Sequence, residues 1–181
     1  MRVLFNPAGQ ATGLRETWLF DEYYTAFAME GLGKTGAKPS QADIDALLHE
    51  NMKNLADYTY FTKARKNGAD IAFRPVTEMS STMRRQRLEM TFVVVFQSPV
   101  DLHGASLEYA IYDPTYYIEM LHADTAGAIR LDGAPAACTH RLIAPAPSIE
   151  TIMLAQALDR TQTAGDGLGA LFAERVEVRC P

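Results

Sequence analysis

The chain of 181 residues has few cysteines, few histidines, a single tryptophan and no long apolar run. Its longest uninterrupted apolar stretch, residues 92–96, falls far short of the roughly 20 residues that a membrane-spanning helix requires, so the sequence predicts no membrane span. Basic residues are in the minority, with 17 Lys and Arg against 22 Asp and Glu, and they form no stripe. This acidic balance argues against a nucleic acid as the partner.

The sequence also lacks the common catalytic motifs. The chain contains no G-x-S-x-G nucleophile turn, no H-E-x-x-H zinc helix and no glycine-rich phosphate loop, so the sequence does not favour an enzyme. The histidines are isolated from one another at spacings that do not suit a shared metal, and each is expected to be structural or exposed. They are His49, His103, His122 and His140.

The two cysteines, Cys138 and Cys180, lie in no C-x-x-C motif, which excludes a zinc site made of cysteine alone. They are compatible with one disulfide in an oxidising compartment, or with two unrelated thiols. The first residues, 1–6, show no signal-peptide pattern, which taken literally means the cytoplasm. Yet residues 3–5 already look like the middle of a strand, so the chain begins abruptly.

The residue pattern predicts a single α+β domain over residues 1–181, with a mostly antiparallel sheet. Two helices should be inserted after the first hairpin, and two short helices should precede the closing strand. Helix starts are predicted at four capping residues, and the pair Asn67-Gly68 predicts a type I′ hairpin. The predicted strands occupy residues 3–5, 14–20, the two arms of a hairpin over 60–74, 78–96, 107–120, 129–131, 138–143 and 176–180. The predicted caps are Asp21, Ser40 (with Asp43 in the capping-box position), Ser148 and Asp166.

Details of these strands lead to further expectations. Residues 97–99 should end the long strand before them, and residues 116–118 should resume an extended run after the turn at Asp113-Pro114. Residues 129–131 could pair with residues 138–143 across the intervening turn.

A cluster of tyrosines around the turn at Asp113 is the strongest candidate for a pocket. Tyrosine buries a large ring but keeps a hydroxyl that needs a partner, so such a cluster is either a corner of the core or a pocket wall. Asp113 is a natural turn residue, and its functional interpretation is a carboxylate that faces this pocket. The candidate pocket residues are Tyr112, Tyr116, Tyr117 and Trp18.

Four segments together resemble a known family. They are residues 13–24, 54–62 and 112–117, with the closing strand 176–180, whose Cys180 lies at the family's spacing from Cys138. The chain resembles, over nearly its whole length, a bacterial domain-of-unknown-function family described as the periplasmic component of an uncharacterised ABC-type transport system. Family members are often encoded beside membrane transporters of zinc, nickel or cobalt.

The resemblance implies a periplasmic, non-enzymatic accessory or solute-binding component of a divalent transition-metal transport system. An inner-membrane metal transporter would be its partner, and zinc or nickel its ligand. The alternative is a periplasmic interaction module that docks a membrane partner without binding metal. The resemblance also implies a disulfide between Cys138 and Cys180.

The chain departs from the family pattern in two places. Relatives usually begin, after a signal peptide, with a His-Pro-His motif, and this segment would lie just upstream of Met1. Many relatives also carry a calcium-like acidic loop, whereas residues 33–40 here lack the oxygen ligands, so no calcium is expected. Carboxylates of the body would then assist histidine in metal binding, and the candidates are Asp21, Glu22 and Asp113.

Overall fold

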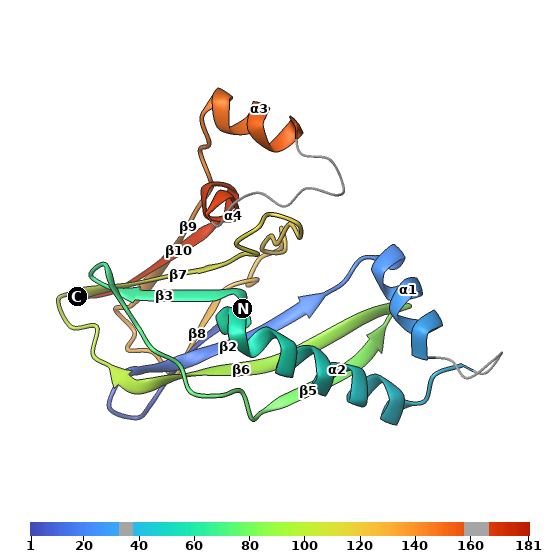
Figure 1. The fold of residues 1–181 in the computed structure, drawn as a ribbon. Helices are drawn as coiled ribbons and strands as arrows, with labels where there is room; N and C mark the ends of the chain where they lie inside the picture. Colours follow the sequence, from blue (N-terminus) through green and yellow to red (C-terminus); the bar gives the residue numbers. More distant parts are fainter. Residues whose placement is uncertain (33–37, 158–166) are drawn as a thin grey trace.

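Two five-stranded sheets packed face to face make up the body of the protein, and two helices extend from one end (Figure 1). The computed structural model describes residues 1–32, 38–157 and 167–181. The predicted α+β class is confirmed, and the pairing is antiparallel at every strand pair of the two sheets except one. Within the described ranges, no helix is long and apolar enough to cross a membrane.

The first sheet has the strand order β5-β6-β2-β1-β8. The one parallel pair among the described strands joins β1 with β8, which are distant in sequence. The strands are β1 (Arg2–Phe5), β2 (Ala11–Leu19), β5 (Met79–Arg84), β6 (Arg87–Val100) and β8 (Arg130–Asp132).

The second sheet has the strand order β4-β3-β7-β10-β9. The predicted hairpin at Asn67-Gly68 is confirmed as its β3–β4 turn, where both residues have positive φ angles of 48° and 84°. The strands are β3 (Thr62–Lys66), β4 (Ala69–Asp70), β7 (Ala105–Ile111), β9 (Thr139–Ile143) and β10 (Arg175–Cys180).

The core between the sheets comes from alternating residues of facing strands. Leu14 of β2 packs there with Leu107 and Tyr109 of β7 and with Val176 and Val178 of β10, and all five are almost fully buried. Such alternation is expected when one face of each strand is covered. Cross-sheet packing therefore explains the period of two that the sequence shows in β7 and β10.

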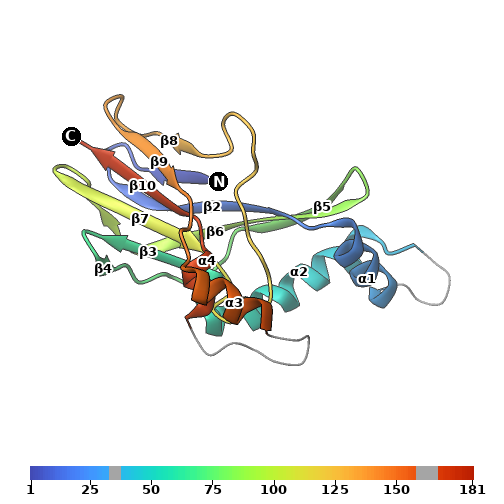
Figure 2. The ribbon, with the colours of Figure 1, turned by 90° about the horizontal axis from the view of Figure 1, so that it is seen from above.

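β2 and β6 are longer than the strands of the second sheet, and α2 (Gln41–Leu55) covers their extension (Figures 1 and 2). The predicted capping box is confirmed: Ser40 and Asp43 each bond the backbone N–H of the other. Ile44, Leu48 and Met52 follow the spacing of one helix face, and all three are buried against the inner face of the first sheet. A second core thus continues the first along the same strands.

The helix α1 (Glu22–Leu32) begins at Asp21, whose Oδ1 accepts the backbone N–H of Tyr24 at 2.8 Å, as predicted for an N-cap. The large apolar residues Tyr23 and Phe27 of this helix are exposed. Thr25 is the buried residue instead, and its hydroxyl accepts the backbone N–H of Leu88 at 3.0 Å. One hydrogen-bonded contact thus anchors α1 to β6.

The helices α3 (Ile149–Ala157) and α4 (Leu168–Phe172) precede β10, as predicted. Ser148 caps α3 by accepting the backbone N–H of Thr151 at 3.2 Å. No residue of α3 is buried, and the helix protrudes from the body beside α4 (Figure 1). The predicted cap Asp166 lies outside the described residues.

Three expectations about strands are wrong. Residues 97–99 do not end β6, which continues to Val100 and places Pro99 near its end. Residues 116–118 form turns rather than a strand. β8 and β9 do not pair with each other, because β8 joins β1 in the first sheet whereas β9 joins β10 in the second.

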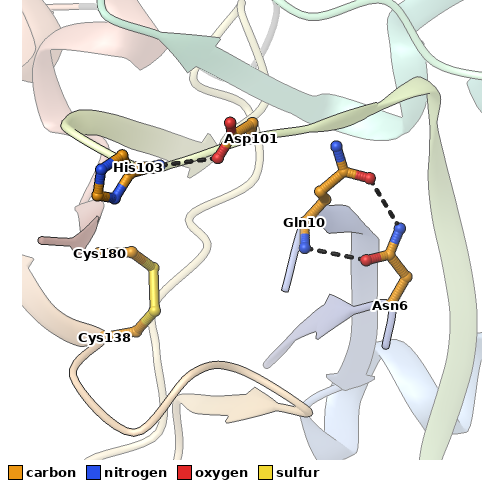
Figure 3. The surroundings of a disulfide bond; sticks show 6 residues. All are labelled: Asn6, Gln10, Asp101, His103, Cys138 and Cys180. Atoms are coloured by element: carbon orange, nitrogen blue, oxygen red, sulfur yellow. Dashed lines mark hydrogen bonds between the residues drawn. A yellow bond between two sulfur atoms is a disulfide. The ribbon is translucent and has the colours of Figure 1, made fainter. Parts of the chain in front are cut away.

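The disulfide between Cys138 and Cys180 is confirmed (Figure 3). The two Cα atoms lie 4.2 Å apart, and the bond ties the start of β9 to the end of β10. His103 lies on the other side of Cys180, where the two residues form a parallel bridge (Figure 3). The disulfide therefore closes the end of the sandwich at which the chain also ends.

Candidate functional site

The three carboxylates predicted as metal ligands lie in two separate places, the start of α1 and the loop after β7. Asp21 caps α1, Glu22 is exposed in its first turn, and Asp113 lies in the loop after β7. Throughout the part of the chain that the structure describes, no group of three or more His, Cys, Asp or Glu side chains is placed to share a metal ion. The structure therefore does not bring Asp21, Glu22 and Asp113 together.

Asp113 is buried and holds the loop that follows it. Its Oδ1 accepts the backbone N–H and the hydroxyl of Thr115 at 2.9 and 2.8 Å, and its Oδ2 accepts the N–H groups of Tyr117 and Ile118 at 3.1 and 3.2 Å. A carboxylate that accepts four such bonds satisfies most of its capacity within the loop. Gly169 of α4 packs directly on the Asp113 carbonyl, with no room for a Cβ atom.

The predicted pocket residues are also separated. Tyr116 stacks on Phe172 of α4 at a centroid distance of 4.3 Å, and Tyr117 is 75% exposed. Tyr112 is half-buried beside Arg65, and burial raises the pKa of its hydroxyl. Only Trp18 borders the site described next, as one wall of a cavity of about 100 Å³.

His122 is the centre of a buried polar group that the sequence did not predict. Its ring Nδ1 lies 2.8 Å from Oε2 of Glu174, and the same oxygen accepts the backbone N–H of His122 at 2.7 Å. On the other side of the ring, Nε2 lies 3.5 Å from the hydroxyl of Tyr109. Glu174 immediately precedes β10, which pairs with β7, so the two strands bring Glu174 and Tyr109 to opposite edges of the imidazole.

His122 lines two cavities. The smaller one, of about 100 Å³, is lined by Trp18, Met120 and His122 among others. The larger one, of about 330 Å³, is lined by His122 together with Asp124, His140 and Glu174. The His122 side chain thus contributes to the lining of both cavities, although only 7% of it is exposed.

A second buried acid, Glu16, lies deeper in the same core. It belongs to the inward face of β2 and is fully buried, and its carboxylate accepts hydrogen bonds from Thr62 Oγ1 at 2.8 Å and from Trp18 Nε1 at 2.9 Å. Burial raises the pKa of Glu16 from its ordinary value near 4.5 to about 7, and the hydrogen bonds from Thr62 and Trp18 oppose that rise. Burial also raises the pKa of Tyr109, and the nearby negative charge of Glu16 adds to the effect.

With this geometry in place, the comparison with known families is informative. The family model described as "Protein of unknown function (DUF1007)" matches residues 1–180. The chain belongs to the DUF1007 family. A Haemophilus influenzae protein described as "Uncharacterized protein" is 26% identical over 175 residues, which cover 94% of this chain and 82% of the relative. No solved structure matches the chain at a significant level.

In this DUF1007 protein, sequence reasoning missed Glu16, His122 and Glu174 for different reasons. Glu16 could have been found, because it lies between Leu14 and Trp18 on the face of β2 that alternation assigns to the core. A carboxylate in that row is the anomaly that indicates a functional or coupled group. His122 and Glu174 are 52 residues apart and meet only through the pairing of β7 with β10, which no local pattern reveals.

The arrangement around His122 suits two kinds of chemistry. A carboxylate on Nδ1 fixes the orientation of the ring and leaves Nε2 to donate its electron pair, which is the usual environment of a metal-binding histidine. The same pair can also exchange a proton with a group in either cavity. The described structure supplies no adjacent nucleophile to His122, and its nearest partner at Nε2 is the hydroxyl of Tyr109.

Proposed function

We propose that the protein is a non-enzymatic accessory component of a divalent transition-metal transport system and acts in the periplasm. The His122–Glu174 pair is the observation that carries this proposal, because an imidazole oriented by a carboxylate is suited to zinc or nickel. The resemblance to a family described as a transport component supports the same role. The disulfide supports an oxidising compartment, where such bonds form and persist.

The metal is cargo in this proposal. A closed zinc site needs about four ligands, and the described residues offer no cluster of three. His122, with help from His140 or Asp124 across the larger cavity, therefore makes a weak and transient contact. Weak contact suits a protein that passes an ion to a transporter, because tight binding would slow its release.

Histidine-selective NMR during a titration with zinc or nickel tests this site. The ring resonances of His122 are expected to shift at lower metal concentration than those of His49, an exposed histidine on α2 whose Nδ1 contacts the carbonyl of Asp45. His49 thus serves as an internal control for non-specific surface binding. In the Glu174→Gln variant the shift of His122 should require more metal. Equal shifts of all the histidines, or none, would refute the proposal.

The carboxylates predicted from sequence remain proposed ligands. The variant Asp21→Asn/Glu22→Gln changes exposed groups, so it separates metal binding from folding. A weaker metal response of this variant would support ligands on α1. An unchanged response would leave the cavity beside His122 as the site.

A second candidate function, docking to a membrane partner without metal binding, is favoured by α3. Its apolar residues Ile149, Met153 and Leu154 are 73%, 64% and 57% exposed, and its only charged residue is Glu150. Co-sedimentation with inner-membrane vesicles tests this role, with protease-treated vesicles as the control. Binding to intact vesicles that is lost after protease treatment and in the Met153→Ser/Leu154→Ser variant would support it. Equal sedimentation of this variant and the unchanged protein would refute it.

A further inference from the structure

An open groove lies beside β3, on the side of this strand that faces away from β7. Neither of the functions proposed above uses it. It lies between the 3-10 turn η1 (Ala56–Phe61), the start of β3 and residues 71–75, which cross from the edge of the second sheet to the edge of the first (Figure 1). The crossing is held at both ends by backbone hydrogen bonds, from the N–H of Ile71 to the carbonyl of Ala64 and from the N–H of Arg74 to the carbonyl of Val95. The groove has a volume of about 450 Å³, which exceeds that of either cavity beside His122 and lies in the range of small-molecule sites.

The lining of the groove is mainly apolar. Ile71 and Phe73 lie on the crossing segment, and Ala64 lies on β3. Tyr60 closes the groove from below: its ring is buried, and its hydroxyl accepts the backbone N–H of Val76 at 3.1 Å. The start of β3, η1 and the crossing segment 71–75 therefore shape this space.

The backbone of η1 is strained where it borders the groove. Thr59, Tyr60 and Phe61 have φ angles of 54°, 55° and 55°, a left-handed conformation that non-glycine residues rarely adopt. Packing maintains this conformation, because Phe61 stacks on Trp18 at 6.3 Å and its carbonyl accepts the N–H of Tyr112 at 2.9 Å. Conformations of this kind gather at ligand clamps and other functional sites, so a strained wall supports a binding role.

Positive charge borders the apolar lining. Lys63 and Arg74 line the groove, and the described residues give neither a carboxylate partner. Lys63 Nζ donates to the hydroxyl of Thr59 at 3.1 Å, and Arg74 donates to the carbonyl of Gln97 at 2.9 Å. The acid in the lining, Asp70, is paired with Arg65 at 2.7 Å. Two cations that form no ion pair within the described residues therefore flank the groove in a protein of net charge −5, although Lys63 lies close enough to Asp70 to lower the pKa of that carboxyl.

We propose that this groove binds a small monocarboxylate with an apolar chain. The carboxylate lies between Lys63 and Arg74, and the chain lies along Ile71 and Phe73 toward the ring of Tyr60. Charge complementarity selects an anion over a cation, and the apolar lining selects an alkyl or aromatic body over a hydrophilic one. Arginine suits this task because its guanidinium can hold a carboxylate with two parallel hydrogen bonds.

Titration with octanoate tests the proposal, with octylammonium as the probe of opposite charge and equal chain length. Isothermal titration calorimetry is expected to detect octanoate binding and no octylammonium binding. Lys63→Gln and Arg74→Gln should each weaken octanoate binding by about tenfold, as expected for the loss of a hydrogen bond to a charged group. Lys38→Gln, an exposed substitution before the opposite end of α2 that does not line the groove, is the matched control and should change nothing.

A steric variant makes the test independent of charge. Ala72 is exposed and lines the groove, so Ala72→Trp should fill the space and abolish octanoate binding while the melting temperature stays unchanged. Met153→Ser on α3 should leave the affinity unchanged, which separates the groove from the exposed apolar helix. Equal affinities for octanoate and octylammonium would overturn the proposal. An octanoate affinity that Ala72→Trp leaves intact would do so too.

Discussion

The buried carboxyl of Glu16 makes the stability of this protein depend on pH around neutrality. In the unfolded chain the group ionises near its ordinary pKa of 4.5, and in the folded protein burial raises that pKa to about 7. Between these two pH values the folded state therefore binds one proton more than the unfolded state, so the free energy of unfolding falls as the pH rises. At about 1.4 kcal/mol per pH unit over roughly 2.5 units, the loss amounts to roughly 3 kcal/mol.

Replacement of Glu16 by glutamine isolates this contribution. The amide oxygen can accept the N–H of Trp18, and the amide nitrogen can donate to the hydroxyl of Thr62, which still donates to the carbonyl of Tyr60. The amide cannot ionise. Near pH 4 the variant and the unchanged protein should be similarly stable. By pH 8 the variant should be more stable by roughly 3 kcal/mol, and the difference should develop between pH 4.5 and 7.

Urea unfolding followed by the fluorescence of the single tryptophan, Trp18, measures this difference. The comparison should be made at several pH values between 4 and 8 with the disulfide intact, so that the titration of other groups cancels between the two proteins. A difference in unfolding free energy that is constant over this range would show that Glu16 does not titrate there. A difference that narrows toward pH 8 would show that the carboxylate is stabilised when charged, which is the opposite of the argument from burial.

Three further predictions concern stability. Gly169→Ala should destabilise the protein by about 1–3 kcal/mol in urea unfolding, because the added Cβ would meet the Asp113 carbonyl. Gly31→Ala, at a position on α1 with open space around it, should stabilise the protein by up to about 1 kcal/mol. Equal effects of the two substitutions would contradict the close packing at Gly169. Asp113→Asn should lower the free energy of unfolding by about 2 kcal/mol, because an amide nitrogen cannot accept the hydrogen bonds that Oδ1 or Oδ2 accepts. An unchanged melting temperature would show that the loop keeps its conformation without these bonds. The Cys138–Cys180 disulfide joins residues 42 positions apart in sequence, and its reduction should lower the free energy of unfolding by about 4 kcal/mol. Calorimetry with and without reductant measures this loss, and an unchanged unfolding transition would refute the prediction.

Local features of the fold could be predicted from sequence because short-range chemistry determines them. The capping box of Ser40 and Asp43, the cap at Asp21 and the turn at Asn67-Gly68 depend only on neighbouring residues, and all three are confirmed. The disulfide followed from the family resemblance, since spacing alone left free thiols open.

Strand partnership could not be predicted, because it depends on contacts between distant segments. β8 and β9 are neighbours in sequence with a turn between them, which favours a hairpin. The structure separates them because β1 offers β8 an edge in the first sheet and β10 offers β9 an edge in the second. The polar centre at His122 escaped prediction for the same reason, since β7 and β10 position its partners Tyr109 and Glu174.

The parallel pairing of β1 with β8 has a consequence for how the chain folds. Arg2 of β1 aligns with Arg130 of the edge strand β8, and Ala11 of β2 aligns with Val100 of β6, so the first sheet joins segments from distant parts of the chain. Contacts of such long sequence separation slow folding, because a large loop must close before they form. The inner face of β2 therefore stays uncovered until most of the polypeptide is available.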